Sequence, residues 1–458
     1  CGQTDEFNKK KNFLEYKNNL SENYYVFSQK NNSKINSYME NKWLKTMDKR
    51  NNKLSKILKN DELKKCINQI VNDANIIDVH THLFPPEFNN FRKSGFTDLL
   101  TYHYLTTELL SGSDIDPKKF FQKSKKIQAE IIWQNLFIEK TPFSEASLGI
   151  LTILKFFNIN CFKKTFDEIE KEFNSCSSNI EYLFNKLNIK KLVMTNNPFN
   201  NEEWELFSKD DWDKNLYLSS IRIDEIFFNK NNKFRVNYEK NGFKKEYLVS
   251  FNKFLEKIYT VSDPKYFALS LDGDQFKNIL KDKLFTEVLI KFLIDRNIPL
   301  SLMLGVKRNV NNNFKLGGDG LGQDGLLELE YLARNYPALK IFTTHLDNSK
   351  HQRIVVLSRK FRNISIFGFW WFNNQSSLVK QGLKLRFELL GHNHILQHSD
   401  ARVDEQLIYK WVNFKEIFKE EIFNIYKLIT SNNWEISDKK IEKDIINLFE
   451  TNPNKMLS

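Results

Sequence analysis

The sequence predicts an α/β fold, a (β/α)8 TIM barrel, and three observations lead to this class. Eight short apolar runs, each ending in polar residues, recur between residues 76 and 402. Such near-continuous apolar runs are typical of parallel strands buried on both faces. Most gaps between the runs have helical spacing, and no GxGxxG follows the first run. The pattern therefore favours a closed barrel over the runner-up, a doubly wound sheet.

Each apolar run is expected to be one strand of the barrel. The runs are IIDVHTH (76–82), KKLVMTN (190–196), YLSSIRID (217–224), YFALSLD (266–272), IPLSLMLG (298–305), LKIFTTHLD (339–347), ISIFGFWWF (364–372) and HILQHSDAR (394–402). Active sites of such barrels lie at the carboxyl ends of the strands. The polar residues that end these runs are therefore the candidates for chemistry.

Helical segments are expected around the barrel, which spans residues 73–412. Residues 1–72 are rich in Lys, Asn and Glu and predict a helical, partly mobile extension. Residues 85–189, between the first two strands, predict a helical insertion at the mouth of the barrel. Residues 413–458 are amphipathic and are expected to form helices that pack on its outside.

Composition limits the partners and the location. The 458-residue chain carries a net charge of +12, but its lysines are spread among Asn and Glu, which disfavours a nucleic-acid partner. No run of eighteen apolar residues predicts a membrane span. Four cysteines without CxxC spacing argue against a thiolate metal cluster and favour a reducing, cytoplasmic location. Membrane anchoring as a bacterial lipoprotein through Cys1 is the alternative.

Two histidines lie two residues apart at the end of the first expected strand. Because side chains alternate along a strand, His80 and His82 should point to the same side. Two converging imidazoles make half of a metal site, although a pair of hydrogen-bonded core histidines is the alternative. Asp400 ends the eighth strand, which neighbours the first in a closed barrel. It could bind the cation, act as a base, or do both.

Other strand ends carry further candidates. Arg402 could anchor a substrate carboxylate or hydroxyl, or form a salt bridge on the rim. Arg222 and Asp224 suit either an internal ion pair or a substrate clamp. His345 could add a ligand, hydrogen-bond a substrate oxygen, or do neither. His398 is more typical of a structural hydrogen-bonder.

In their order along the chain, several motifs resemble those of the uronate isomerases, a branch of the metal-dependent amidohydrolase superfamily. They are HTHLFPPEF, TYHYL with its pair His103-Tyr104, MTNNP, SIRID, LMLGVKRN, GFWWFNN and SDAR, over roughly residues 70 to 412. The chain departs from the family pattern at Met303, where a histidine is usual, and at Asn196 and Asn197, which replace two aspartates.

The resemblance implies the interconversion of an aldohexuronate and its ketose, D-glucuronate and D-fructuronate or the galacturonate and tagaturonate pair. This aldose–ketose isomerisation moves a proton between C2 and C1 through an enediol. One Zn2+, or another divalent metal, would be held by His80, His82 and Asp400, and Asp400 would be the base. A hexuronate would be the small-molecule partner, and a homo-oligomer is compatible with the family.

The resemblance also implies roles for residues around this centre. Tyr104 and His103 would assist proton transfer from the insertion. Arg222 and Arg402 would hold the carboxylate or hydroxyls of the sugar, and His345 would add a further contact. Trp371, or its neighbour Trp370, would offer a surface to the sugar ring.

Two other function classes remain open on the sequence. A mononuclear metal-dependent hydrolase or decarboxylase of the same superfamily would use the same ligands and a metal-activated water. A binuclear hydrolase is disfavoured because the fourth expected strand has no lysine and the fifth offers Met303. A sugar-binding protein without enzymatic activity is the third hypothesis.

Overall fold

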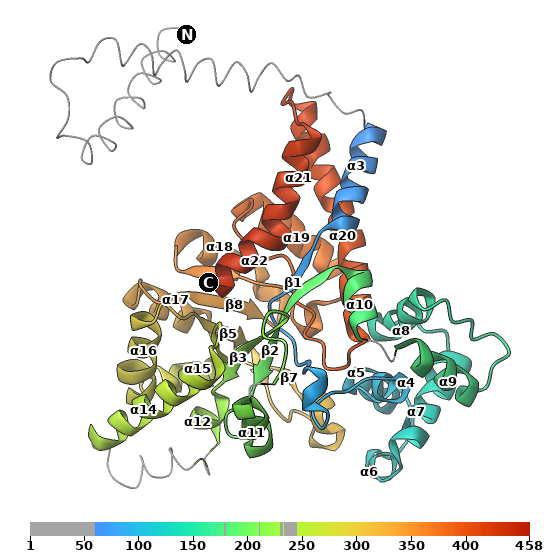
Figure 1. The fold of residues 1–458 in the computed structure, drawn as a ribbon, viewed down its shortest axis with the longest axis horizontal. Helices are drawn as coiled ribbons and strands as arrows, with labels where there is room; N and C mark the ends of the chain where they lie inside the picture. Colours follow the sequence, from blue (N-terminus) through green and yellow to red (C-terminus); the bar gives the residue numbers. More distant parts are fainter. Residues whose placement is uncertain (1–59, 178–179, 210, 230–231, 233–244) are drawn as a thin grey trace. The chain divides into compact units, whose positions relative to one another are not determined.

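A curved sheet of seven parallel strands forms the centre of the molecule (Figure 1). The structure is a computed structural model and describes residues 60–177, 180–209, 211–229, 232 and 245–458. Strand order follows the sequence, with neighbours in parallel register. The strands are β1 (Ile76–Asp78), β2 (Ile189–Asn196), β3 (Tyr217–Arg222), β4 (Phe267–Leu271), β5 (Leu300–Leu304), β8 (Ile341–His345) and β9 (Ile364–Ile366).

Helices return the chain from each strand to the next and cover the outer face of the sheet (Figure 1). Apolar side chains from both strand and helix fill the layer between them, as Leu269, Leu302 and Phe285 do. These helices are α11 (Asn201–Lys209), α12 (Asp224–Phe228), α14 (Lys245–Ser262), α15 (Gly273–Ile279), α16 (Ile290–Asp295), α17 (Leu326–Asn335), α18 (His351–Lys360) and α19 (Ser376–Leu390). The predicted α/β class with TIM-barrel architecture is confirmed.

The expected eighth strand, residues 394–402, is not a regular strand. A single bridge joins Ile395 to Phe367 beside β9. Farther along, Asp400 N donates to His80 O (3.1 Å) and His82 N donates to Ala401 O (2.7 Å). The segment therefore lies between β9 and the end of β1 and closes the ring without a continuous ladder. One physical reason is the backbone of Asp400, whose φ of 52° is incompatible with a strand.

Most strands are somewhat shorter than the expected runs, and two of them end well before the expected residue. The first stops at Asp78, and the seventh stops at Ile366 rather than at residue 372. Gly368 (φ 57°) and Trp371 (φ 39°) turn the backbone out of the extended region, and Trp371 begins a 3₁₀ helix, η6 (Trp371–Asn373). An unbroken run of apolar residues in the sequence does not reveal such turns, because the residues that follow a turn remain buried.

The described part of the chain between β1 and β2 is mostly helical, and its helices lie together at one side of the sheet (Figure 1). Side chains cap several of these helices, as Asp116 does for α6 and Ser144 for α8. The helices are α4 (Phe96–Leu100), α5 (His103–Ser111), α6 (Pro117–Phe121), α7 (Lys125–Trp133), α8 (Glu145–Phe156), α9 (Phe166–Ser177) and α10 (Ile180–Leu187).

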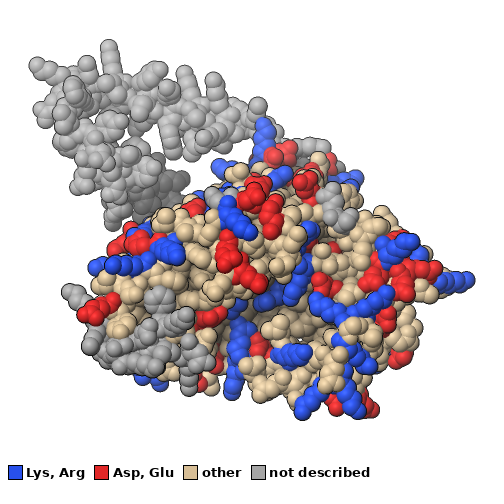
Figure 2. Space-filling view, turned by 60° about the horizontal axis from the view of Figure 1, so that its bottom comes forward, with Lys and Arg blue, Asp and Glu red and all other residues tan. Residues whose placement is uncertain are grey.

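Helices from both ends of the described chain pack together. α3 (Asn60–Asp73) contacts α20 (Gln406–Ser431) and α21 (Asp438–Ile446), and α22 (Asn452–Leu457) contacts β1. Residues 1–59 of the expected N-terminal extension lie outside the described residues. Among the helices that are described, none is both long enough and apolar enough to cross a membrane. On the face in Figure 2, basic and acidic side chains are interspersed rather than segregated.

A buried carboxylate links β1 to the segment that closes the ring. Asp78 is fully buried and accepts hydrogen bonds from Ser399 N (3.1 Å) and from Trp411 Nε1 (2.9 Å). Burial raises the pKa of Asp78, and these hydrogen bonds offset part of that effect. The side chain of Asp78, two residues before His80, thus joins β1 to Ser399 and to helix α20.

Replacing Trp411 by Phe should lower the free energy of unfolding by about 1–3 kcal/mol, because a buried carboxylate oxygen loses its indole donor. Urea unfolding followed by circular dichroism measures the change. Trp434→Phe is the matched control, since Trp434 is 70% exposed and its replacement should have almost no effect. Equal losses in the two variants would contradict a specific role for the Asp78–Trp411 bond.

Candidate active site

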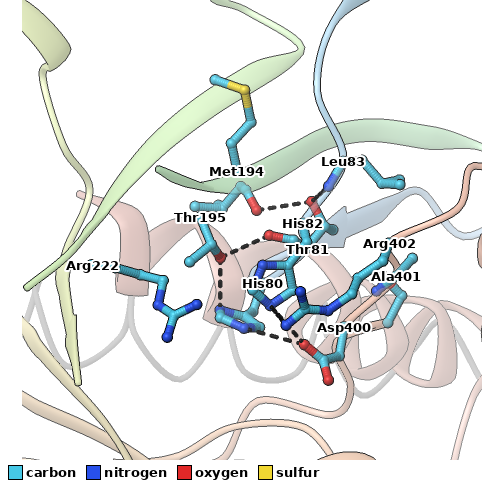
Figure 3. Close-up of polar contacts among 12 residues, drawn as sticks. His80, Thr81, His82, Leu83, Met194, Thr195, Arg222, Asp400, Ala401 and Arg402 are labelled. Carbon is cyan, nitrogen blue, oxygen red and sulfur yellow. Dashed lines mark hydrogen bonds and ion pairs between the residues drawn. The ribbon is translucent and has the colours of Figure 1, made fainter. Parts of the chain in front are cut away.

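Two imidazoles and one carboxylate converge where β1 meets the closing segment. Oδ1 of Asp400 lies 3.4 Å from Nε2 of His80 and 3.3 Å from Nε2 of His82. Figure 3 shows both rings directed at this oxygen, while the second carboxylate oxygen points away from them. The three ligand atoms all lie within 4.8 Å of one another. The structure therefore brings together the three residues expected to form a metal site.

Hydrogen bonds behind His80 fix which nitrogen faces the cluster. Nδ1 of His80 lies 3.0 Å from the hydroxyl of Tyr266, which itself donates to Val79 O (2.9 Å). Thr195 Oγ1 lies 3.5 Å from the same nitrogen and donates to Thr81 O (2.7 Å). Both hydroxyl hydrogens are thus committed elsewhere, so Nδ1 must be the donor. In the neutral ring, Nε2 then carries a lone pair toward Asp400.

His82 also presents a lone pair to the cluster. The guanidinium of Arg402 lies 3.2 Å from its Nε2 and can only donate, so this nitrogen accepts. Burial and then the charge of Arg402 lower the pKa of His82 well below its usual value, which keeps the ring neutral. Burial would raise the pKa of Asp400, but it is held well below its usual value by hydrogen bonding and charge from whichever imidazole carries a proton, and a cation in place of that proton would keep the carboxylate ionised. These are the protonation states that metal ligands require.

The geometry of the three atoms fits a divalent cation. Ligand atoms bonded at about 2.0–2.2 Å to a tetrahedral Zn2+ lie roughly 3.3–3.6 Å apart, as the Asp400–imidazole pairs do. Nε2 of His80 and Oδ1 of Asp400 are buried and, within the described ranges, have no hydrogen-bond partner. A lone pair facing a carboxylate oxygen at this distance is repulsive, and a cation between them would remove the repulsion.

A cavity opens over the cluster and toward solvent. Strand ends, the insertion and the segment after β5 all contribute to its walls. The lining residues are His80, His82, Tyr102, His103, Tyr104, Thr195, Arg222, Ala268, Ser270, Met303, Arg308, Leu316, Asp319, Trp370, Trp371, Asp400 and Arg402.

Three arginines line this cavity, and two of them are paired with carboxylates. Nε of Arg222 contacts Asp224 Oδ2 at 3.2 Å, and Nη1 of Arg308 contacts Asp319 Oδ2 at 2.5 Å. Arg402 forms no ion pair with a carboxylate of the described chain. Its guanidinium is therefore the least neutralised cation in the cavity.

Aromatic side chains from the insertion and from η6 form one wall of the cavity. The ring of Trp371 lies edge-on to His103 (centroids 5.0 Å apart) and stacks near Tyr104 (6.0 Å). Burial, followed by the charge of Arg402, lowers the pKa of His103 to about 3, so its ring is neutral. Burial raises the pKa of Tyr104 well above its usual value, so its hydroxyl keeps its proton. Both side chains reach the cavity from α5.

Other predicted candidates lie outside the cavity. The ring nitrogens of His345 are engaged by the backbone, Nε2 with Asp324 O (3.0 Å) and Nδ1 with the backbone of Asp347. His345 is not among the lining residues, so we leave it out of the proposed site. His398 is buried below His80 with ring centroids 5.3 Å apart. It lines no wall of the cavity, and neither of its nitrogens has a partner in the described part of the chain.

Several residues of the site were missed by sequence reasoning. Tyr266 orients His80 from the start of the fourth strand, where an apolar run gives no reason to expect a polar contact. Thr195 and Arg308 lie inside motifs that resemble the uronate isomerases, MTNNP and LMLGVKRN, so those motifs carried a usable signal. Arg308 also depends on Asp319, and their pairing across the β6–β7 hairpin, β6 (Val306–Lys307) and β7 (Gly320–Leu321), is visible only in three dimensions.

Asn196 and Asn197, where the family pattern has aspartates, do not line the cavity. Asn196 Nδ2 donates to Glu203 Oε1 (3.0 Å) and Asn197 Nδ2 donates to Glu225 Oε1 (2.8 Å). The two amides therefore pair with carboxylates beside the end of β2. Met303, at the position where a histidine is usual, does line the cavity.

Comparison with known proteins places the chain in a family. No protein-family model and no curated protein sequence matches it. A uronate isomerase of Bacillus halodurans is 31% identical, with a TM-score of 0.81, over 88% of this chain and 97% of the other.

Two more distant structures show the same fold. A uronate isomerase of Thermotoga maritima is 17% identical (86% of this chain, 97% of the other), and a glucuronate isomerase of Caulobacter crescentus is 15% identical (87% and 94%). Each has a TM-score of 0.67. Because the likeness to the Bacillus structure extends over nearly all of both chains at 31% identity, this chain is an isomerase that belongs to the uronate isomerase family.

Proposed function

We propose that this enzyme interconverts an aldohexuronate and its ketose, D-glucuronate and D-fructuronate or D-galacturonate and tagaturonate. The observation that carries the proposal is the meeting of His80, His82 and Asp400 beneath a cavity lined by three arginines. A hexuronate has a carboxylate at one end and a carbonyl at the other. The cavity offers cationic groups for the first and a polar, proton-handling cluster for the second.

His80, His82 and Asp400 would hold one Zn2+ per chain. Two imidazole nitrogens and one carboxylate oxygen are a typical donor set for zinc, with positions left for substrate oxygens. When bound, such a cation would polarise the C1 carbonyl and the C2 hydroxyl of the sugar. Tyr266 and Thr195 keep the Nε2 lone pair of His80 directed at this position.

Asp400 has a second oxygen available for proton transfer. Oδ1 faces the imidazoles, while no hydrogen bond of the described residues occupies Oδ2, which Figure 3 shows directed away from the rings. Oδ2 would take the proton from C2 and return it to C1. The protonated hydroxyl of Tyr104 would donate to the sugar oxygen on which charge develops, and neutral His103 would accept or donate a further hydrogen bond.

Arg402 is the best candidate to bind the sugar carboxylate. Among the cavity arginines it alone lacks a carboxylate partner in the described chain, so a bound anion would neutralise it. Arg222 and Arg308, which Asp224 and Asp319 hold in place, would hydrogen-bond hydroxyl groups along the sugar. The ring of Trp371 would cover the apolar face of the sugar.

Incubating the purified enzyme with D-glucuronate or D-galacturonate in D2O tests the proposal. NMR should show ketose formation and, for a substrate pair, deuterium entering at C2 as the reaction reverses. Asp400→Asn should reduce both by about 10²–10⁴-fold. Its fold should survive because asparagine also tolerates a positive φ. If neither sugar exchanges nor isomerises, the proposed reaction is wrong, and an active Asp400→Asn enzyme would assign the base elsewhere.

Tyr266→Phe should weaken metal binding by about 10–100-fold, since the hydrogen bond that fixes the His80 tautomer is lost. Competition with a chromophoric chelator measures the dissociation constant for Zn2+. Tyr426→Phe is the matched control, because Tyr426 is equally buried and its hydroxyl contacts Asp444 far from the cluster. Unchanged zinc affinity in Tyr266→Phe would contradict the orienting role.

Arg402→Lys should raise KM for the hexuronate by about tenfold or more, because lysine cannot replace a bidentate guanidinium. The preference for a hexuronate over the corresponding neutral hexose should fall in parallel. Arg334→Lys serves as the control, since Arg334 is exposed and paired with Glu330. Zinc content is measured in each variant, and an Arg402→Lys enzyme with normal zinc and normal KM would show that the carboxylate binds elsewhere.

A further inference from the structure

A second cavity lies at the opposite end of the strands from His80 and Asp400. It has a volume of about 820 Å3 and includes residues at or just before the starts of β8 and β9. The ends of α18 and α19 and helix α22 supply the rest of its wall, and Figure 1 shows these helices close together. The cavity lies where residues 391–395 form only one β-bridge, between Ile395 and Phe367. The sheet is therefore incomplete at this end.

Positive charge dominates the walls of this cavity. Lys340, Arg359, Arg362 and Lys455 line it, against one acidic residue, Glu388. These four cations come from separate parts of the fold, namely the start of β8, the end of α18, the loop before β9, and α22. None of them forms an ion pair with a carboxylate in the ranges that the structure describes. The charge is therefore concentrated and not neutralised internally.

Capping of helix ends accounts for only part of this pattern. Helices that return between parallel strands end at this face, and basic side chains near helix C-termini bind the last carbonyl groups. Arg359 does so, donating through Nη1 to Leu389 O at the end of α19. No such bond is formed by Lys340, Arg362 or Lys455 among the described residues, so helix capping does not explain their convergence.

A buried histidine forms part of the wall of this cavity. His394 lines the cavity but is only 2% exposed, and its ring nitrogens are themselves buried, with the backbone of Gly391 acting on the ring. Burial, followed by the charge of Arg386, lowers the pKa of His394 to about 3, so its ring is neutral. A neutral imidazole does not repel the cations around it, and a charged ligand in the cavity would alter the environment of its nitrogens.

We propose that this cavity binds a small, multiply charged anion, with Arg362, Lys340 and Lys455 neutralising its charge beside the part of the wall that His394 forms. The ligand is a phosphorylated molecule or a polycarboxylate, since both present oxygen anions to guanidinium and ammonium groups. Phe342 and Met456 add an apolar part to the wall. The site is separate from the isomerase centre and does not depend on the proposed reaction.

Calorimetric titration of the full chain with pyrophosphate and, separately, with citrate tests the site. We expect saturable binding of one anion per chain that weakens as salt is added. Arg362→Glu/Lys455→Glu should reduce the affinity at least about tenfold, because two charge-assisted contacts become repulsive. Lys439→Glu/Lys443→Glu on exposed positions of α21 makes the same change in net charge away from the cavity and should bind as the unaltered chain does.

Histidine-selective ¹⁵N NMR gives a direct readout of His394. Saturation with the anion that binds should shift the nitrogen signals that His394→Gln removes. Binding of pyrophosphate alone would identify a phosphorylated ligand, and binding of citrate alone a polycarboxylate; either result supports the site. Absence of saturable binding by both anions would overturn the proposal, as would equal affinity in the two double variants or an unshifted His394 signal at saturation.

Discussion

Two backbone hydrogen bonds between residues 80–82 and 400–401 hold the site together. Asp400 N donates to His80 O, and His82 N donates to Ala401 O. Two segments more than 300 residues apart in the sequence are thereby held side by side. The side chains of His80, His82 and Asp400 all start from this paired backbone, so their ligand atoms lie close together. Asp78 reinforces this junction from below through Ser399 N and Trp411.

The same junction explains how charge is arranged around the cluster. Two cationic groups at the mouth are held by acidic partners close to them in the sequence, Arg222 by Asp224 and Arg308 by Asp319. Arg402 belongs to the closing segment and contacts His82 instead. Its position next to the imidazole follows from its place two residues after Asp400. The cavity thus combines two neutralised guanidinium groups with one that is available to an anion.

Much of the architecture could be predicted because each strand is a buried apolar run. The positions of His80, His82 and Asp400 followed from period-two geometry and from the adjacency of first and last strands. The expectation of a regular eighth strand over residues 394–402 was wrong, because these residues are mostly buried but do not form a continuous ladder of backbone hydrogen bonds. His345 lies at a strand end as expected, but its ring contacts the backbone of Asp324 and Asp347 and does not line the cavity. Tyr266 was missed because it begins an otherwise apolar run, just before β4, where the sequence has no marker for a polar partner.

The φ of 52° at Asp400 limits how this centre can change in evolution. Outside glycine, aspartate and asparagine are among the few residues that adopt this conformation readily, whereas β-branched and bulky residues are strained there. An exchange for asparagine removes the charge with little strain, while an exchange for a longer or branched ligand requires a new backbone path. A lineage with this loop can therefore lose its chemistry by one substitution, but a different ligand set would need the loop itself rebuilt.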